Sequence, residues 1–280
     1  MIVDIFPAMG TTFEAHTATG VEAVAIRHRV ARFEQRFSRF LATSELSQIN
    51  SSEGSWHAVS EPMSRVLDAA AMVKDRTGGL VDIGVGAAVV SWGYTVPFDD
   101  LPSSVALGSL VSATGWQACD GTVRLDGRTK LDLGGIAKGW ACDEIVESGM
   151  AQMVSAGGDL RSSDPDVIVE VVDHFNNPIA DIHVGRGALA TSSTMKRRWT
   201  TDVGGANHLI DPRTMRPVKS PITQATVVAE TAVEAEAGAK AVLLQGVDGL
   251  AWADRQPWIR QAVAVWHDGS VYATKDRQAA

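Results

Sequence analysis

Hydrophobic and polar positions along the chain follow two different periods, which predict a mixture of helices and strands. Apolar residues at helical spacing predict helices over residues 20–37, 61–77, 86–93, 137–147 and 231–245, with a short polar one over 252–258. Alternating or short apolar runs predict a strand or hairpin arm over residues 4–18. They also predict strands over residues 80–83, 124–132, 153–156, 167–172, 179–184, 188–191, 208–210, 225–229, 263–266 and 271–273. Helices and strands are interleaved without a strict βαβ order, so the α+β class is expected.

Local signals predict where some of these elements begin and end. Ser60 and Pro62 are expected to open the second helix, and Gly78-Gly79 to end it. Residues 44–50 are expected to form a polar turn region, and residues 97–110 an irregular segment or a short helix.

Two Asp-Gly pairs predict hairpin turns. Asp126-Gly127 is expected to close a hairpin over residues 119–133, and Asp268-Gly269 is expected to close one over residues 263–273. Neither a repeat nor a low-complexity linker marks a boundary, so a single domain over residues 1–280 is expected.

The segment Leu131-Asp-Leu-Gly-Gly-Ile-Ala-Lys-Gly-Trp140 carries the clearest chemistry. A strand is expected to end at Asp132, Gly134-Gly135 to turn the chain, and a helix to begin at Ala137. Backbone N–H groups, a helix N-terminus and the Lys138 ammonium then lie beside one another, a geometry that attracts an anion. The Asp132 carboxylate adds a group for a polar ligand edge or a metal. The alternative interpretation is an ordinary strand–turn–helix link.

Composition narrows the class of protein without indicating a reaction. The chain has 280 residues, of which 45% are hydrophobic and 21% charged, as in soluble globular proteins. Its net charge of −8 argues against a nucleic-acid surface as its main purpose, so no nucleic-acid partner is expected. The basic run Lys196-Arg-Arg198 is either a solvated loop or a contact for a phosphate or an acidic partner.

The cysteines and the N-terminus bear on location. Cys119 and Cys142 have neither the spacing of a metal site nor a C-x-x-C motif, so reduced or buried thiols are expected. The first residues, Met-Ile-Val-Asp-Ile-Phe-Pro, contain no basic n-region and no long apolar run. A cytoplasmic protein without a membrane anchor is therefore expected.

Seven short motifs follow one another along the chain in an order typical of one family. They are Met9-Gly-Thr11, Phe37-Ser-Arg-Phe40 leading into Ser44-Glu-Leu-Ser-Gln-Ile-Asn50, Gly79-Leu-Val-Asp-Ile-Gly-Val-Gly86, Leu131 to Gly139, Ser155-Ala-Gly-Gly-Asp159, Ala190-Thr-Ser-Ser193 and His208-Leu-Ile-Asp-Pro-Arg-Thr214. Together they resemble the ApbE family, the flavin transferases that move FMN from FAD to a protein threonine.

The resemblance implies a compact, two-lobed α/β body of the ApbE type, which is T-fold-like, with mixed or antiparallel sheets. The nucleotide would lie in a groove between the lobes. The resemblance also implies FAD as substrate or ligand, an acceptor flavoprotein as partner, and Mg²⁺ at a metal site.

Position by position, the resemblance implies that several motifs bind the flavin nucleotide. The residues concerned are Met9, Phe40, Leu80, Val81, Asp82, Asp132, Gly135, Lys138, Thr191, Ser192, Leu209 and Ile210. Phe40 lacks the hydroxyl of the family's usual tyrosine, and Leu80-Val81-Asp82 stands where the family has Ala-Phe-Asp. The alternative for Met9, Phe40 and Val81 is core packing, whereas Asp82 and Asp132 need partners in their apolar, glycine-rich surroundings.

Three residues are expected to take part in catalysis. Lys138 is the expected phosphate contact. His208 and Asp211 lie in a His-x-x-Asp-Pro motif that the family places near the flavin and the reacting phosphate. His208 is a candidate general base or phosphate donor, because imidazole exchanges protons near neutral pH. The alternative is a surface histidine, or one with satisfied hydrogen bonds, at the start of a strand.

Small departures from the family motifs surround this segment. Thr191 and Ser192 can donate hydroxyls to the ligand or close a turn, and Ser193 and Met215 stand where the family usually has glycine.

The sharpest departure concerns the metal. The family's late helix carries an Asp and, four residues later, a Thr, which bind Mg²⁺ together with a backbone carbonyl that corresponds to Gly135. Here Glu236 stands at the Asp position and Lys240 at the Thr position. A charged lysine cannot ligate a metal. Either Lys240 replaces the charge of the metal, which the closely packed alanine-rich helix favours, or it pairs with Glu236 on the helix surface and leaves no metal site.

Three functions follow from the resemblance. The leading one is transfer of FMN from FAD to a threonine with release of AMP. The alternatives are a non-catalytic FAD- or FMN-binding protein and an FAD pyrophosphatase that forms FMN and AMP. The change at the metal position is expected to lower transfer more than nucleotide binding.

Overall fold

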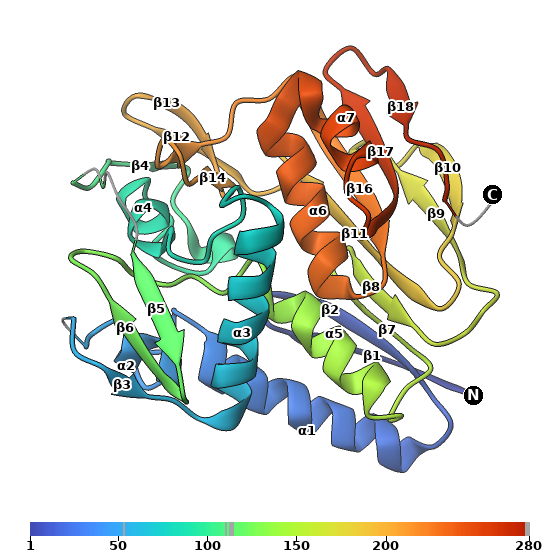
Figure 1. The fold of residues 1–280 in the computed structure, drawn as a ribbon, viewed down its shortest axis with the longest axis horizontal. Helices are drawn as coiled ribbons and strands as arrows, with labels where there is room; N and C mark the ends of the chain where they lie inside the picture. The colour runs from blue at the N-terminus through green and yellow to red at the C-terminus, as the bar shows by residue number, and fades with distance from the viewer. Residues whose placement is uncertain (53, 110, 112–114, 278–280) are drawn as a thin grey trace. The chain divides into compact units, whose positions relative to one another are not determined.

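The computed structural model describes residues 1–52, 54–109, 111 and 115–277 (Figure 1). It divides into two compact units. Unit 1 contains Met1–Ala31, Lys138–Lys196 and Lys219–Ala280, and unit 2 contains Arg32–Ala137 and Arg197–Val218. The single domain expected over residues 1–280 stays a prediction.

Unit 1 is built on an eight-stranded sheet in which every pair of neighbours is antiparallel. In spatial order its strands are β1 (Ile2–Ala8), β2 (Thr11–Thr17), β7 (Met153–Ala156), β8 (Asp159–Ser162), β11 (Gly187–Ser193), β16 (Ile222–Ala229), β17 (Ile259–Trp266) and β18 (Val271–Ala273). A separate antiparallel pair joins β9 (Ile168–Val172) to β10 (Pro178–His183).

Strand β16 shows no polar alternation because both of its faces are covered. All eight of its residues are buried. Val227 faces helix α6 (Ala232–Gln245), where a Cβ on Gly238 would lie 2.9 Å from Val227 Cγ1. Val228 points to the opposite face and packs in one cluster with Val171 of β9 and Ile182 of β10. The glycine in α6 therefore lets the helix lie close to the sheet.

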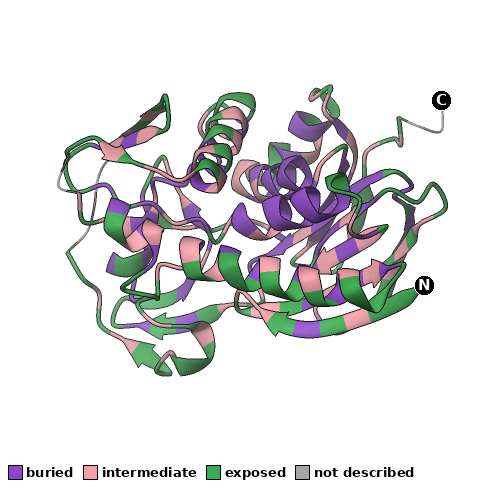
Figure 2. Ribbon diagram, turned by 90° about the horizontal axis from the view of Figure 1, so that it is seen from below, coloured by how far each residue is buried: buried purple, intermediate pink, exposed green. Residues whose placement is uncertain are grey.

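The remaining helices of unit 1 cover the same sheet. They are α5 (Ala137–Glu147), which begins at the last residue of unit 2, the 3-10 turn η2 (Gly246–Asp248) and α7 (Gly249–Asp254). Helix α1 (Gly20–Phe37) begins in unit 1 and ends in unit 2. Buried residues, purple in Figure 2, make up most of α5 and α6.

Unit 2 consists of short elements around an aromatic core. Its helices are α2 (Glu45–Ile49), α3 (Glu61–Arg76), α4 (Gly86–Ser91) and the 3-10 turn η1 (Phe98–Asp100). Its strands form the sheets β3 (His57–Ala58), β6 (Thr122–Leu125) and β5 (Trp116–Cys119); β13 (Gly204–Asn207), β12 (Arg198–Thr201) and β4 (Ser104–Val105); and β14 (Ile210–Asp211) with β15 (Arg216–Pro217). Trp92 and Trp199 lie in the core, and Trp199 Nε1 donates a hydrogen bond of 2.8 Å to the Trp92 carbonyl.

The long helices and the antiparallel pairing confirm the α+β class. Helices α1, α3, α5 and α6 match the predicted ranges to within one residue. Ser60 caps α3 by accepting a hydrogen bond from the Met63 N–H, and β17 and β18 form the predicted closing hairpin. Cys119 is exposed, Cys142 is buried, and both are free thiols, as predicted.

The predicted hairpin over residues 119–133 was wrong in its turn. The hairpin pairs β5 with β6, and its turn is Asp120-Gly121, with φ angles of 47° and 69°. Positive φ at both positions matches the twist of the two strands. Strand β6 ends at Leu125, and Lys130 makes only an isolated bridge, so the strand predicted over 124–132 was also wrong.

Side chains that bind the backbone explain two further corrections. Residues 44–50 contain helix α2, because Ser44 accepts a hydrogen bond from the Ser47 N–H and caps it. Residues 80–83 form no strand, because the Thr77 hydroxyl accepts the Val81 N–H and the Asp82 carboxylate accepts the Gly84 N–H.

Several predicted ranges shift. The segment 97–110 contains η1 and β4, although Leu110 lies outside the described residues. The strand predicted at 208–210 begins only at residue 210, and the helix predicted at 252–258 lies at 249–254.

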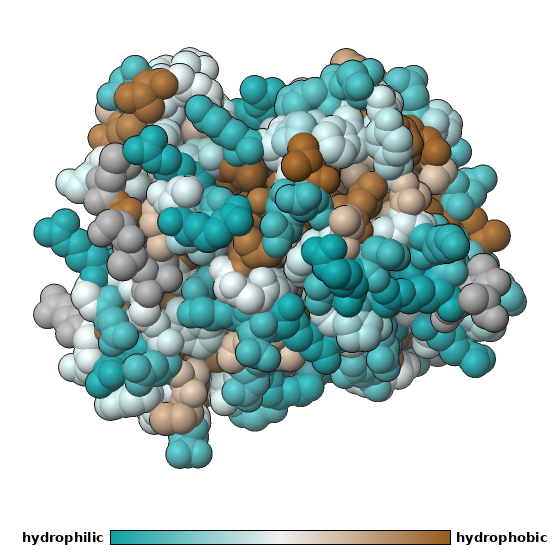
Figure 3. Space-filling view, turned by 45° about the horizontal axis from the view of Figure 1, so that its top comes forward, coloured by the Kyte–Doolittle hydropathy of each residue, from teal (hydrophilic) through white to brown (hydrophobic). Residues whose placement is uncertain are grey.

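The surface is mainly polar on the face drawn in Figure 3, where hydrophobic side chains lie in separate groups. Among the described residues, no helix has the length and apolar composition that crossing a bilayer requires.

Candidate functional site

Helices α5 and α6 and strand β8 of unit 1 bring four charged side chains together. Lys138 Nζ lies 2.9 Å from Asp159 Oδ2 and 3.1 Å from Glu236 Oε1. Lys240 Nζ lies 2.8 Å from the same Glu236 oxygen, because the two residues are one turn apart on α6. Lys138, Asp159, Glu236 and Lys240 are called the four-charge network below.

The start of α6 is anchored on α5. Thr231 and Glu234 form a capping box, in which each side chain accepts a hydrogen bond from the backbone N–H of the other. The Asp143 carboxylate of α5 accepts hydrogen bonds of 2.8 Å from the Ala232 N–H and 3.0 Å from the Val233 N–H. These contacts satisfy N–H groups that a helix leaves unpaired at its start, and they hold α6 beside the helix that carries Lys138.

Gly139 allows this close approach. A Cβ at Gly139 would lie 3.0 Å from the Ala232 backbone and 3.1 Å from Glu236 Oε2. That oxygen is buried and has no hydrogen-bond partner among the described groups. Glu236 Oε1 therefore makes the polar contacts of this carboxylate, and Oε2 is packed against α5.

Burial and neighbouring charges act in opposite directions on the network. The side chains of Glu236 and Asp159 are 4% and 6% exposed. Burial alone would raise the pKa of Glu236, but the ammonium groups of Lys138 and Lys240 outweigh it and lower the pKa to about 2. Burial alone would lower the pKa of Lys138, but Asp159 and Glu236 outweigh it and raise the pKa above its ordinary value. Burial and the Glu236 charge raise the pKa of Asp159.

Mg²⁺ does not fit this set of donors. Mg²⁺ needs six oxygen ligands at about 2.0–2.1 Å, whereas two ammonium groups lie within hydrogen-bond distance of Glu236 Oε1. The described residues contain no group of three or more His, Cys, Asp or Glu side chains that could hold a metal. Gly135, the other predicted ligand, lies in unit 2. Of the two sequence interpretations, pairing of Lys240 with Glu236 is observed, but Glu236 is buried and Lys240 is partly buried, so the pair does not lie on an exposed helix surface.

The other unit 1 residues predicted to bind the nucleotide lie at two places on the sheet. Met9, with a φ of 51°, and Gly10 form the two-residue turn between β1 and β2. Thr191 and Ser192 lie on β11, where the Thr191 hydroxyl is 2.9 Å from the Thr226 hydroxyl and Ser192 is buried. A non-glycine residue with positive φ is strained, and such strain clusters at functional sites.

In unit 2, Asp132 is tied to an arginine that the sequence analysis did not select. Asp132 Oδ2 lies 2.8 Å from Arg39 Nε, and Asp132 Oδ1 accepts a hydrogen bond of 2.7 Å from the Gly134 N–H. The guanidinium carbon of Arg39 lies 4.1 Å from the Phe40 ring centroid and 4.6 Å from that of Tyr94. Arg39 Nη2 is buried and has no hydrogen-bond partner among the described groups.

Asp82 is satisfied by protein groups on both oxygens. Oδ1 accepts hydrogen bonds of 2.8 Å from Trp116 Nε1 and from the Gly84 N–H, and Oδ2 lies 2.8 Å from Lys74 Nζ. The Asp82 carboxylate therefore has the partners that the sequence analysis expects for it. The neighbouring residues Leu80 and Val81 are buried.

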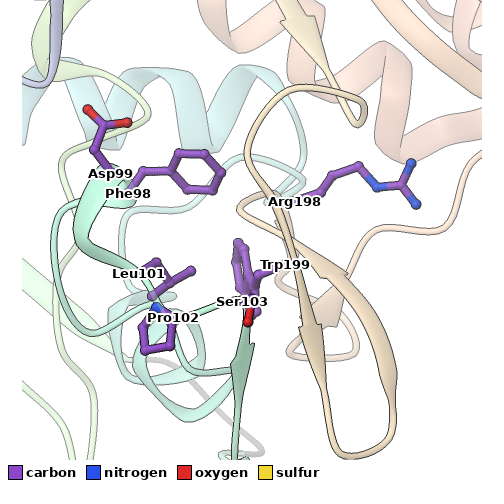
Figure 4. Close-up of a pocket in the computed structure, with 7 residues that line it drawn as sticks. All are labelled: Phe98, Asp99, Leu101, Pro102, Ser103, Arg198 and Trp199. Atoms are coloured by element: carbon purple, nitrogen blue, oxygen red, sulfur yellow. The ribbon is translucent and has the colours of Figure 1, made fainter.

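Phe40 belongs to an aromatic cluster in unit 2, formed by Phe40, Tyr94, Phe98 and Trp199. Phe40 is its most exposed member at 37%. A pocket of about 290 Å³ adjoins the cluster and is lined by Phe98, Asp99, Leu101, Pro102, Ser103, Arg198 and Trp199 (Figure 4). The charged groups of Asp99 and Arg198 point away from the rings in Figure 4, so polar groups do not converge on it as in a nucleotide site. It contains none of the predicted ligand residues.

The His208–Asp211 segment is held by hydrogen bonds and an ion pair with neighbouring residues and by burial of its two apolar side chains. The Leu209 N–H donates to Asn207 Oδ1 at 3.0 Å, and Leu209 and Ile210 are buried. Asp211 forms an ion pair of 2.8 Å with Arg213 and also accepts the Arg213 N–H. His208 is partly buried at the start of this segment.

Two residues missed by the sequence analysis had a signal in the motifs. Arg39 lies inside Phe37-Ser-Arg-Phe40, and Asp159 ends Ser155-Ala-Gly-Gly-Asp159. A charged residue beside an apolar or glycine-rich run needs a partner, which was the signal available for both. Lys74 and Trp116, the partners of Asp82, had no such signal.

Comparison with known proteins identifies the family. The model of the ApbE family matches residues 9–263. The chain belongs to the ApbE family. The FAD:protein FMN transferase of Escherichia coli strain K12 is 26% identical over 239 residues, which cover 76% of this chain and 68% of that protein. The FAD:protein FMN transferase of Rhodobacter capsulatus is 27% identical and matches 99% of this chain, which spans only 58% of that protein.

Solved structures of ApbE proteins share the fold. The ApbE protein of Thermotoga maritima has a TM-score of 0.85 at 25% identity, covering 98% of this chain and 97% of that one. The flavin transferase ApbE of Vibrio cholerae has a TM-score of 0.77 at 21% identity, with 99% and 97% coverage. The ApbE-like fold expected from the sequence motifs is therefore confirmed.

Proposed function

We propose that this chain is an FAD-binding flavin transferase that moves FMN from FAD to a threonine of an acceptor protein and releases AMP. The observation that carries the proposal is the family match over residues 9–263, together with relatives named FAD:protein FMN transferase. Among the residues that the motifs select, Asp132, Lys138 and Thr191 are polar and have defined partners, which supports a role in binding a polar ligand.

In the proposed reaction, the threonine hydroxyl oxygen attacks the FMN phosphorus. The bond from that phosphorus to the bridging oxygen breaks, and AMP leaves with this oxygen. The proton of the hydroxyl passes to a base, for which His208 is the candidate, with Asp211 beside it in the same motif. Negative charge develops on the phosphoryl oxygens, so fixed positive groups stabilise the transition state.

We assign the nucleotide contacts as follows. Phe40 offers a partly exposed ring, and Arg39 and Asp132 offer charged groups next to that ring. In unit 1, Lys138 and Lys240 supply positive charge next to two carboxylates. Met9, Thr191 and Ser192 remain proposed contacts in unit 1, and Gly135, Leu209 and Ile210 in unit 2.

A second candidate is a non-catalytic FAD- or FMN-binding protein. The presence of Lys240 beside Glu236 favours it, because a lysine supplies one positive charge where a divalent cation supplies two. Binding tolerates that difference better than phosphoryl transfer does. FAD hydrolysis to FMN and AMP is the third outcome, with water replacing the threonine.

One experiment separates the three. The purified protein is incubated with FAD, with and without an extract that supplies acceptor proteins, and AMP, free FMN and protein-bound flavin are quantified by chromatography. AMP with covalently bound FMN supports transfer, and AMP with free FMN supports hydrolysis. Bound FAD without AMP identifies a binding protein, and the absence of binding contradicts the proposal.

A further inference from the structure

The four-charge network balances its own charge inside unit 1. Two ammonium groups face two carboxylates, and both carboxylate side chains are at least nine-tenths buried. Removal of Lys240 alone would leave two buried carboxylates facing one ammonium group. An uncompensated buried charge is strongly destabilising, so such a site would attract another cation.

The space around Glu236 is also filled. Lys138 and Lys240 both lie against Oε1, and Oε2 lies so close to Gly139 that a single added carbon would be 3.1 Å away. Mg²⁺ usually keeps several of its waters when it binds a protein. A hydrated dication would have to displace Lys240 before it reached either oxygen.

We propose that the Lys240 ammonium is a built-in substitute for a divalent cation: it closes the α6 carboxylate to metal ions and makes flavin-nucleotide binding independent of Mg²⁺. The first half concerns the protein without nucleotide. The second half rests on the proposed function, and assigns to Lys138 and Lys240 the attraction of the nucleotide's diphosphate. These two lysine side chains are 15% and 14% exposed, more than the carboxylates that hold them, so they are the members of the network open to a ligand.

The metal half is tested with Mn²⁺, a paramagnetic stand-in for Mg²⁺, titrated against the nucleotide-free protein and followed by electron paramagnetic resonance. The wild type should not bind Mn²⁺ through Glu236, so Mn²⁺ binding should be the same in the wild type and in the Glu236→Gln variant. Lys240→Thr, which removes the charge and adds an oxygen ligand, should bind one Mn²⁺ per chain. Lys240→Arg keeps the charge and should bind none, which makes it the matched control.

Two results would overturn the metal half. The first is Mn²⁺ bound by the wild type and lost in Glu236→Gln. The second is a folded Lys240→Thr variant that binds no Mn²⁺. If Lys240→Thr does not fold, the wild-type titration and its Glu236→Gln control still decide the question.

The nucleotide half is tested by FAD affinity in Mg²⁺ and in chelator. The wild type should give the same dissociation constant in both to within about twofold, whereas Lys240→Thr should bind FAD at least about tenfold more tightly with Mg²⁺, on the scale of one charge-assisted contact. A wild type whose FAD affinity rises tenfold with Mg²⁺ contradicts the inference. A wild type that binds neither Mn²⁺ nor FAD contradicts the proposed function and leaves the metal half standing.

Discussion

The Arg39 side chain contacts both Asp132 and the Phe40 ring, two residues that we propose bind the nucleotide. Its Nε lies 2.8 Å from Asp132, and its guanidinium packs on the rings of Phe40 and Tyr94. Without the guanidinium, Asp132 loses its ion pair and the Phe40 ring loses its packing partner, so neither proposed contact is held in place.

Replacement of Arg39 by Gln is therefore expected to weaken FAD binding. Charged hydrogen bonds contribute about 1.5–3 kcal/mol, which corresponds to a roughly ten- to hundredfold change in affinity. The measurement is quenching of flavin fluorescence on titration. Arg27→Gln is the matched control, because Arg27 also pairs with an aspartate and packs on a phenylalanine, but on strand β1. Equal affinities for the two variants would exclude a role of Arg39 in binding.

Lys138 has two expected roles, one in the stability of the fold and one in phosphate binding. Lys138→Met leaves Asp159 and Glu236 with Lys240 alone, so a loss of about 3–5 kcal/mol in the free energy of unfolding is expected, as for a broken buried ion pair. Urea denaturation measures it. FAD affinity of the folded variant should fall about tenfold or more. Unchanged stability would show that the network is not the compensated cluster described here.

For single residues, the sequence indicates which side chains are candidates for ligand binding better than it indicates which other side chains they contact. Asp132 and Lys138 could be selected because they flank a glycine pair at the start of a helix. The partner of Lys138 on α6 is 98 residues away in sequence, and nothing local indicates that contact. The motif marks Lys240 as unusual, but whether its side chain is buried or exposed depends on the packing of α6.

At the scale of elements, the turn between β1 and β2 contains a strained residue. Met9 adopts a φ of 51° and is only partly buried, and Met215 adopts a φ of 55° but is buried in the unit 2 core. A left-handed conformation costs a non-glycine residue about 1–2 kcal/mol, and asparagine tolerates it better.

Met9→Asn is accordingly expected to raise the thermal midpoint by a few degrees while weakening FAD binding, because the side chain proposed to contact the nucleotide is lost. Met215→Asn relieves the same strain but buries a polar group in an apolar cluster, so its midpoint should fall. Differential scanning calorimetry on both variants provides the comparison. A fall for Met9→Asn would mean that packing, rather than ligand contact, retains the methionine.

The start of α6 should make stability depend on pH. Burial raises the pKa of Asp143 to about 7, although the Ala232 and Val233 N–H groups and Arg161 act in the opposite direction. The folded state then binds a proton that the unfolded state has released between about pH 4 and pH 7. This group therefore stabilises the fold at low pH, and its contribution declines by up to about 1.4 kcal/mol per pH unit as pH rises through that window.

Asp143→Asn removes this titration. The difference in the free energy of unfolding between wild type and variant should be most favourable to the wild type near pH 5 and should shrink towards pH 8. Chemical denaturation at several pH values measures it. A difference that grows with pH would mean that the ionised carboxylate acts as a favourable cap.

Element ends were predictable where a side chain binds the local backbone. Ser60 marks the start of α3, and the glycine pair at 78–79 marks its end. Asp-Gly occurs at 120–121 as well as at 126–127, and only the pairing of β5 with β6 decides which one forms the hairpin turn. The apolar run at residues 80–83 predicts a strand, because the run itself does not show that the side chains of Thr77 and Asp82 bind the local backbone N–H groups.

At the scale of the whole molecule, the order of the motifs predicted the family and its fold, whereas periodicity alone predicted only the α+β class. The eight-stranded order β1-β2-β7-β8-β11-β16-β17-β18 could not be derived from local patterns, because it joins strands from both ends of the chain. Strand β16 is an example. Both of its faces are covered, so its sequence resembles any buried apolar segment and does not indicate which strands lie beside it.

We expect this ApbE family member to bind FAD without a metal ion. The decisive measurement is a calorimetric titration of the wild type with FAD, once in excess chelator and once in excess Mg²⁺. We expect heat of binding and quenched flavin fluorescence in both titrations, with dissociation constants equal to within about twofold. The absence of binding at protein concentrations well above micromolar, or binding that requires Mg²⁺, would contradict it.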